Sequence, residues 1–185
     1  MQFGLRAAIV AGYRMVFRYD QSPFCREPDP TKLDKDQQKL CGHWAPPALD
    51  LALSFAPLDF VEPYAWLRLG LSAEEQTDTK PLVVVGAGAR IYTSNESRFK
   101  IFIEPAIAAE LEDGRGDPDW LMTDDMGVTT APEYKTDLLF HLAVGPQYDF
   151  MRYVGVYAHA GITTGVLRYI HTELELSLGV QVRVP

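Results

Sequence analysis

Three histidines, His141, His159 and His171, lie among acidic residues in the C-terminal part of the chain and are suited to chemistry. Imidazole binds transition metals and transfers protons near neutral pH, and a carboxylate such as Asp137 or Glu173 could orient the ring. The residue types leave three possibilities: a metal site, a general base, or hydrogen bonding within a protein interior. We expect hydrogen bonding, because no further residue completes a recognisable ligand or catalytic pattern.

Two other segments could bind a metal ion or form a covalent link. Asp113, Asp117 and Asp119 are candidate calcium ligands, but acidic residues in loops are usually only solvated, so we predict no metal and no other cofactor. The chain has only two cysteines, Cys25 and Cys41, in one polar segment. We expect them to form a disulfide in an oxidising compartment.

The elements that carry these residues show an alternation of period two. Between Phe3 and Tyr19 every second residue is apolar or aromatic, and Arg6, Arg14 and Arg18 occupy the other positions together with small residues. A helix would need apolar residues three and four positions apart. The stretch therefore predicts one long strand.

The same alternation recurs along the chain and predicts eight strands, at 3–19, 48–55, 62–71, 82–93, 99–111, 135–148, 153–163 and 170–184. Long loops are predicted at 20–47, 72–81 and 112–134, and a shorter one at 164–169. Because proline removes a donor from the ladder, bulges are expected at Pro63, Pro105 and Pro146. An even number of strands with short turns at one end and longer loops at the other indicates an antiparallel up-and-down barrel of the outer-membrane type.

The residue types on the two faces of the predicted barrel indicate which face contacts lipid and which lines the lumen. The apolar set is too large for the lumen of an eight-stranded barrel, which a single mixed set of side chains fills. The other set combines glycine and alanine with charges, and each charge would cost about 2–4 kcal/mol if it faced lipid near the membrane centre. We therefore predict that the apolar face contacts lipid and the charged face lines the lumen. Aromatic residues at strand ends are expected to form interfacial girdles, among them Tyr19, Trp44, Phe60, Tyr92, Phe99, Tyr148, Phe150, Tyr153 and Tyr169.

The charges on the lumen face have both signs, so they are expected to pair. Closing the barrel brings the last strand beside the first, which places Glu173 and Glu175 near Arg14 and Arg18, with Asp50 on the other side. Buried charges without partners would be costly. The predicted network consists of Arg14, Arg18, Asp50, Arg68, Arg90, Glu104, Asp137, His141, His159, His171, Glu173 and Glu175.

Composition excludes several classes of protein. The chain has 185 residues, of which 47% are hydrophobic, and a net charge of −8. An acidic chain is unsuited to tracking phosphates, so nucleic acid is not an expected partner. No apolar run is long enough for a membrane helix, and Met1 leads into the first strand without a signal peptide's pattern, so an exported form would be the mature chain. A single domain over 1–185 is expected.

The alternation from Phe3 to Val184 resembles the small eight-stranded outer-membrane barrels of the OmpA, OmpX and OmpW type. The last strand is similar to the assembly signal of that class in Ser177, Gly179, Val182 and Val184, although the chain ends on Val184-Pro185 rather than on an aromatic residue. The resemblance implies a transmembrane barrel in a Gram-negative outer membrane with periplasmic termini. It also implies contacts with outer-membrane lipid, lipopolysaccharide and the barrel-assembly machinery.

For function, the resemblance favours a non-enzymatic role in envelope structure, or in surface recognition of envelope or extracellular proteins through the loops. A conduit for small or apolar solutes, as proposed for the OmpW type, is the alternative and requires an open lumen. A lipid-modifying enzyme is the third possibility. However, neither His159 nor His171 is followed by the serine of the His-x-Ser pattern of the outer-membrane deacylase. A soluble lipid-binding barrel remains as an alternative fold.

Overall fold

The computed structural model describes residues 2–17, 31, 40–58, 60–72, 81–94, 97–111, 122–123, 129–130, 136–151, 153–167 and 170–184. Its long strands are β1 (Gln2–Phe17), β2 (Leu40–Ala56), β3 (Val61–Gly70), β4 (Val83–Tyr92), β5 (Phe99–Leu111), β8 (Asp137–Met151), β9 (Val154–Gly165) and β10 (His171–Val184). Two short strands, β6 (Met122–Thr123) and β7 (Thr129–Thr130), pair with each other inside the predicted third loop. Across the described residues, no helix combines the length and the apolar character needed to cross a membrane.

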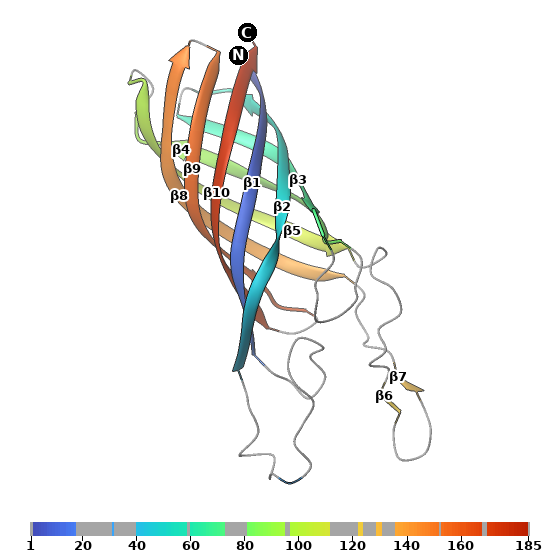
Figure 1. Cartoon of the computed structure of the whole chain (residues 1–185). Coiled ribbons are helices and arrows are strands. Elements are labelled where there is room, and N and C mark those ends of the chain that lie inside the picture. Colours follow the sequence, from blue (N-terminus) through green and yellow to red (C-terminus); the bar gives the residue numbers. More distant parts are fainter. Residues whose placement is uncertain are drawn as a thin grey trace.

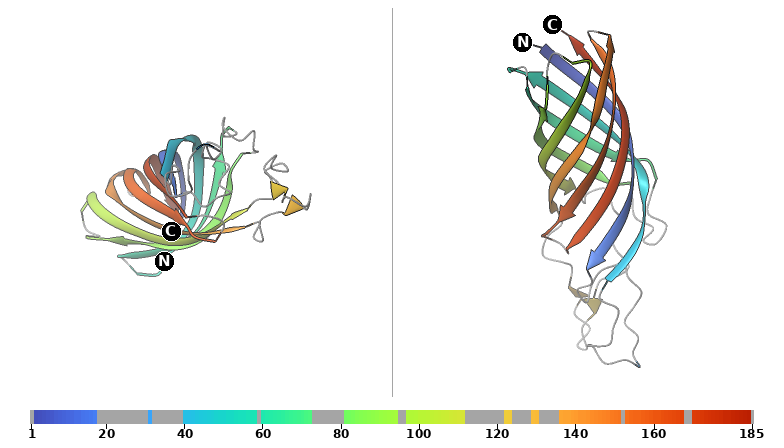
Figure 2. Two further views of the ribbon diagram at one scale, coloured as in Figure 1. Left: turned by 90° about the horizontal axis from the view of Figure 1, so that it is seen from below. Right: turned by 90° about the vertical axis from the view of Figure 1, so that its left-hand side faces the viewer.

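The eight long strands form a closed antiparallel barrel in the order β1-β10-β9-β8-β5-β4-β3-β2. This confirms the predicted all-β, eight-stranded antiparallel barrel. The first and last strands close the ring, with a register that runs from Phe3↔Val184 to Val16↔His171. The two ends of the chain therefore lie side by side at one end of the barrel (Figure 1). Figure 2 shows the strands from below and from the side, wrapped around a common axis.

Strand β2 starts at Leu40, so the predicted first loop is too long at its C-terminal end. Pro46 and Pro47, which fall inside the predicted loop, lie within the strand. The ladder between β1 and β2 shifts register between Val10 and Gly12, opposite Pro46 and Pro47. A bulge of this kind accommodates residues that cannot donate to the ladder.

The bulges predicted at Pro63, Pro105 and Pro146 are wrong. Each of these prolines is paired in regular register with one neighbouring strand. On its other side, Pro105 faces β4 and Pro146 faces β9. There the pairing is interrupted at the proline and resumes beyond it in the same register. A single missing donor is thus absorbed locally, whereas two consecutive prolines in β2 coincide with a register shift.

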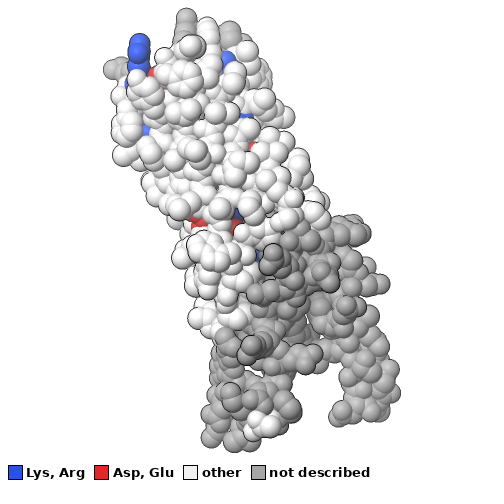
Figure 3. Space-filling view, in the orientation of Figure 1, with Lys and Arg blue, Asp and Glu red and all other residues white. Residues whose placement is uncertain are grey.

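Buried and exposed side chains alternate along the strands, and the exposed set is apolar. Leu176 and Leu178 are each 69% exposed, whereas Arg14 is only 2% exposed and Arg90 is fully buried. Over the described strands the face shown in Figure 3 is almost entirely free of charge, with only small patches of Lys, Arg, Asp or Glu. The barrel is therefore apolar outside and charged inside, as its sequence predicts.

Most of the described aromatics expected at the girdles do face outward. The exposed members are Trp44, Phe60, Phe99, Tyr148 and Phe150. The assignment of Tyr92 is wrong, because it is 7% exposed and its hydroxyl donates to Glu62 at 2.8 Å inside the lumen. Tyr92 shares the face of β4 that carries Arg90, so the alternation would have placed it correctly. Tyr19 and Tyr169 lie outside the described residues.

The close approach of β8 and β9 depends on a glycine. A Cβ atom at Gly145 would collide with the backbone carbonyl of Ala158 and the Cα of His159. Gly145→Ala is expected to lower the free energy of unfolding in detergent by about 1–3 kcal/mol, because backbone in a closed barrel cannot withdraw easily. Urea titration of folded barrel would measure this. In the control Gly161→Ala, the added Cβ meets side-chain atoms at 3.1 Å and should cost clearly less; equal costs would contradict the expectation.

Candidate functional site in the barrel lumen

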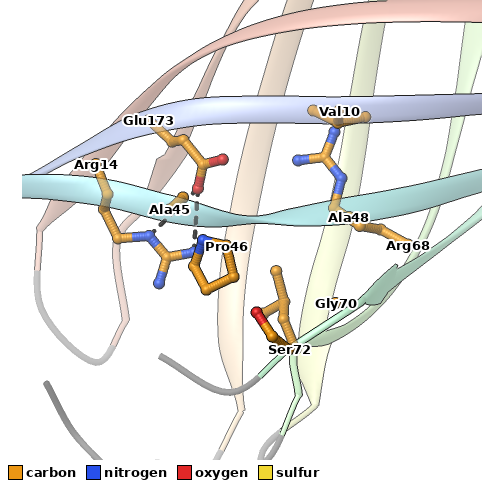
Figure 4. A pocket seen from close by; sticks show the side chains of 10 residues that line it. Val10, Arg14, Ala45, Pro46, Ala48, Arg68, Gly70, Ser72 and Glu173 are labelled. Carbon is orange, nitrogen blue, oxygen red and sulfur yellow. Dashed lines mark hydrogen bonds and ion pairs between the residues drawn. The ribbon is translucent and has the colours of Figure 1, made fainter. Parts of the chain in front are cut away.

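The described charges of the lumen form layers, and the first lies at the end of the barrel away from the chain termini. Arg14 and Glu173 are register partners on β1 and β10. The Arg14 Nη2 atom lies 3.0 Å from Glu173 Oε2, and both side chains are buried. Figure 4 shows this pair next to Pro46, beside a cavity of about 10 Å³. Arg18, expected to join the pair, lies outside the described residues.

The second layer is organised by Arg68 of β3. Its Nε donates to Asp50 Oδ1 at 2.7 Å, and its Nη1 donates to Glu175 Oε2 at 2.6 Å. Glu175 was expected near Arg14, but it reaches across the lumen instead. The register explains the difference, because Arg14 lies opposite Glu173, two residues before Glu175 in β10.

The third layer spans the diameter of the barrel. Arg6 on β1 donates from Nη1 to the Glu104 carboxylate at 3.1 Å, and Arg90 donates from Nε to Glu104 Oε2 at 2.6 Å. β1 and β5 occupy opposite positions in the ring of eight strands, so the Arg6–Glu104 bond crosses the lumen. The Arg90 guanidinium also lies over the rings of Phe102 and Tyr157, at 3.8 and 4.4 Å from the centroids.

A fourth layer, nearest the chain termini, was not part of the predicted network. Glu62 accepts hydrogen bonds from Gln181 at 2.8 Å and from Arg183 at 3.0 Å, as well as from Ser54 and Tyr92. A second carboxylate, Asp149, lies 2.7 Å from the ammonium group of Lys100. The alternation predicts that Glu62, Lys100 and Arg183 lie on the inward phase of their strands, and the structure places them there.

Of the three histidines, His171 lies near the far rim, with Asp137. Its Nδ1 is 3.5 Å from Asp137 Oδ2. Asp137 also accepts hydrogen bonds from the backbone amides of Val166 and Leu167, at 3.1 and 2.7 Å. This carboxylate therefore holds the connection between β9 and β10 against β8.

His141 lies deeper, in the second layer. Its Nδ1 is 2.9 Å from Glu175 Oε1 and 2.9 Å from the Thr163 hydroxyl. Asp137 and Glu173 were the two carboxylates that could orient a histidine, and Asp137 does approach His171. Glu173 is engaged with Arg14, and Glu175 takes the corresponding place beside His141.

Side chains occupy most of the described lumen. Besides the cavity of about 10 Å³, one of about 20 Å³ lies among Arg6, Glu104, His141 and His159. Each holds little more than one water molecule. The ion pairs that join opposite walls can therefore stiffen the barrel.

The residues similar to an assembly signal lie in the second half of β10. Ser177 is buried and Gly179 packs against Tyr157 and Ala8, whereas Val182 and Val184 face outward with exposures of 44% and 58%. Their role in assembly stays a prediction.

Other predicted sites fall largely in parts of the chain that are not described. Asp113, Asp117 and Asp119 lie outside the described residues, as does Cys25. The described part contains no free cysteine, and Cys41 lies in β2 opposite Val16.

The Cys25–Cys41 disulfide stays a prediction that thiol labelling can test. The unfolded, non-reduced chain is expected to resist a maleimide reagent and to accept two equivalents after reduction. Cys25→Ser should expose Cys41 to labelling without reduction. Labelling of the unreduced parent chain at both cysteines would contradict the pairing.

No protein-family model matches the sequence, and a comparison with curated proteins found no match. Solved structures do share the fold. The N-terminal β-barrel domain of Pseudomonas aeruginosa OprF superposes with a TM-score of 0.53 at 10% identity, over 96% of this chain and 97% of that one. Neisserial surface protein A superposes with a TM-score of 0.54 at 14% identity, over 97% and 96%. The fold is thus that of the small eight-stranded outer-membrane barrels, and at these identities the likeness concerns the fold alone.

Proposed function

We propose that this chain is an integral barrel of a Gram-negative outer membrane with a closed polar lumen, and that it acts without catalysis in envelope structure or in surface recognition. Residues 1–185 then form one domain, with the termini in the periplasm and the longer connections outside. The observation that carries the proposal is the reversal of inside and outside: leucine, isoleucine and valine cover the barrel, and ion pairs fill it.

The outer surface supports a lipid environment. Monomeric soluble proteins rarely expose contiguous apolar patches larger than a few hundred Å². Here large apolar side chains more than 40% exposed recur on the strands, for example Ile9, Ile107, Leu142 and Leu176. A soluble lipid-binding barrel would instead place its apolar face inward, around the ligand.

The lumen supports a closed barrel over the two alternatives. A conduit needs a continuous path, whereas the Arg6–Glu104 bond joins opposite walls and Arg68 bridges Asp50 to Glu175. A lipid-modifying enzyme needs its polar groups at the lipid-facing rim. His141, His159 and His171 are instead buried within the lumen, with exposures of 6%, 7% and 2%.

Gel mobility and single-channel recording together test the proposal. Folded protein in detergent is expected to migrate differently before and after boiling, because a closed barrel resists unfolding by detergent at room temperature. In a planar bilayer it should show no steady conductance. Discrete openings would favour the conduit, and good solubility without detergent combined with no heat shift would overturn the membrane assignment.

A further inference from the structure

One cluster of lumen side chains is not explained by ion pairing. His141 on β8, His159 on β9 and Glu175 on β10 converge so that one potential ligand atom from each lies within 4.8 Å of the others. All three are buried, with exposures of 6%, 7% and 2%. The three strands are consecutive in the barrel, so the cluster is held by two backbone ladders.

Small residues create the space in which these ligand atoms meet. Gly161 lies on the inward face of β9, two positions from His159, and opposite Glu175 in register. A Cβ atom at Gly161 would meet the Cβ of Ala143 and the Oε1 of Glu175, each at 3.1 Å. A larger residue at this position would therefore press on the carboxylate oxygen that faces the histidines.

The hydrogen bonds of the cluster are incomplete in a specific way. Both ring nitrogens of His159 are buried and have no hydrogen-bond partner. A buried polar group without a partner is destabilising and calls for an explanation. A cavity of about 20 Å³ lies beside this unsatisfied ring, and its charged and histidine lining consists of Arg6, Asp50, Arg90, Glu104, His141 and His159.

The other two members are held in place by their neighbours. Glu175 accepts from Arg68 through Oε2, at 2.6 Å, which leaves Oε1 turned toward His141. The Thr163 hydroxyl, 2.9 Å from Nδ1, fixes the His141 ring. The Arg68 bond to Glu175 is a supporting bond of the kind that orients metal ligands in known sites.

We propose that His141, His159 and Glu175 bind one divalent transition-metal ion of the zinc class inside the lumen, linking β8, β9 and β10. Two imidazole nitrogens and one carboxylate oxygen are a ligand set that zinc accepts, with a fourth position left for water. Together with the ligand Glu175, the carboxylates of Asp50 and Glu104 equal the guanidinium groups of Arg6, Arg68 and Arg90 in number. The ion would therefore enter a layer without net positive charge.

Zinc titration of the folded full-length chain, stripped with a chelator and held in detergent, tests the site. We expect saturable binding of one Zn²⁺ per chain and a rise in the temperature at which the heat-modifiable gel band is lost. His159→Asn and His141→Asn should each weaken binding by about tenfold or more, because each removes a proposed ligand and the loss of an outer-shell partner alone typically costs about 10–100-fold. Both variants are made so that the test still works if one of them does not fold. The heat-modifiable gel band shows which variants are folded.

His171→Gln is the matched control, because His171 is an equally buried lumen histidine outside the cluster. It should leave zinc binding unchanged. Absence of saturable binding by the parent chain would overturn the proposal. The proposal would also be overturned if folded His159→Asn bound zinc as tightly as the parent chain. It would be overturned as well if His171→Gln lost as much zinc affinity as His159→Asn.

Discussion

Replacing Glu104 by alanine is expected to lower the free energy of unfolding by about 3–5 kcal/mol, because it leaves two buried guanidinium groups without their shared carboxylate. Glu104 accepts hydrogen bonds from both Arg6 and Arg90, and the exposures of these three residues are 6%, 2% and 0%. Urea titration in detergent, followed by tryptophan fluorescence or by the heat-modifiable band, would measure the change.

The control removes the whole triad. The variant Arg6→Met, Arg90→Met, Glu104→Leu has no uncompensated charge, and well-packed apolar replacements of buried ion pairs are often neutral or stabilising. It should therefore recover most of the stability lost in Glu104→Ala. A cost below about 1 kcal/mol for Glu104→Ala would indicate that the arginines reach solvent and that the lumen is wetter than the structure implies.

The second large effect concerns the outer surface. Leu178→Arg is expected to destabilise the protein in a bilayer by about 2–4 kcal/mol, because Leu178 lies midway along β10 and faces outward. Val184→Arg, at the end of the same strand and also exposed, is the matched control and should cost only about 0–1 kcal/mol. Denaturant titration of protein folded into vesicles compares the two directly.

A dependence on depth distinguishes lipid from water as the solvent of this surface. In a barrel surrounded by water, arginine at either position would be harmless or would improve solubility. Equal costs at Leu178 and Val184 would therefore count against a bilayer around the barrel, even if both variants still folded.

The alternation of side chains made the barrel and its reversed faces predictable. A strand has only two faces, so a few unambiguous residues such as Arg6 and Leu5 assign every other residue of β1. Closure of the ring then made one specific contact predictable, that of Arg14 with Glu173, because the first and last strands must pair. No other topological information was needed for either inference.

Contacts between side chains on opposite sides of the lumen could not be predicted from the sequence. Whether Glu175 meets Arg14 or Arg68 depends on the tilt and stagger of the strands, and a one-residue change in register would reverse every face. The same holds for the convergence of His141 with His159, which lie on neighbouring strands but are not register partners. Proline was misleading for a different reason, since its missing donor can be tolerated in regular register or can coincide with a bulge.

The seam between β1 and β10 has a consequence for how the molecule must be made. Phe3 and Val184 are paired although almost the whole chain separates them, so forming this ladder costs the greatest loss of chain entropy, and we expect it to form last. Until β10 docks, the sheet has two open edges. In lipid each unpaired backbone group there costs several kcal/mol, and in water the same edges would invite aggregation. The partly assembled sheet is therefore unstable in both solvents, and insertion and closure are expected to occur as a single concerted event.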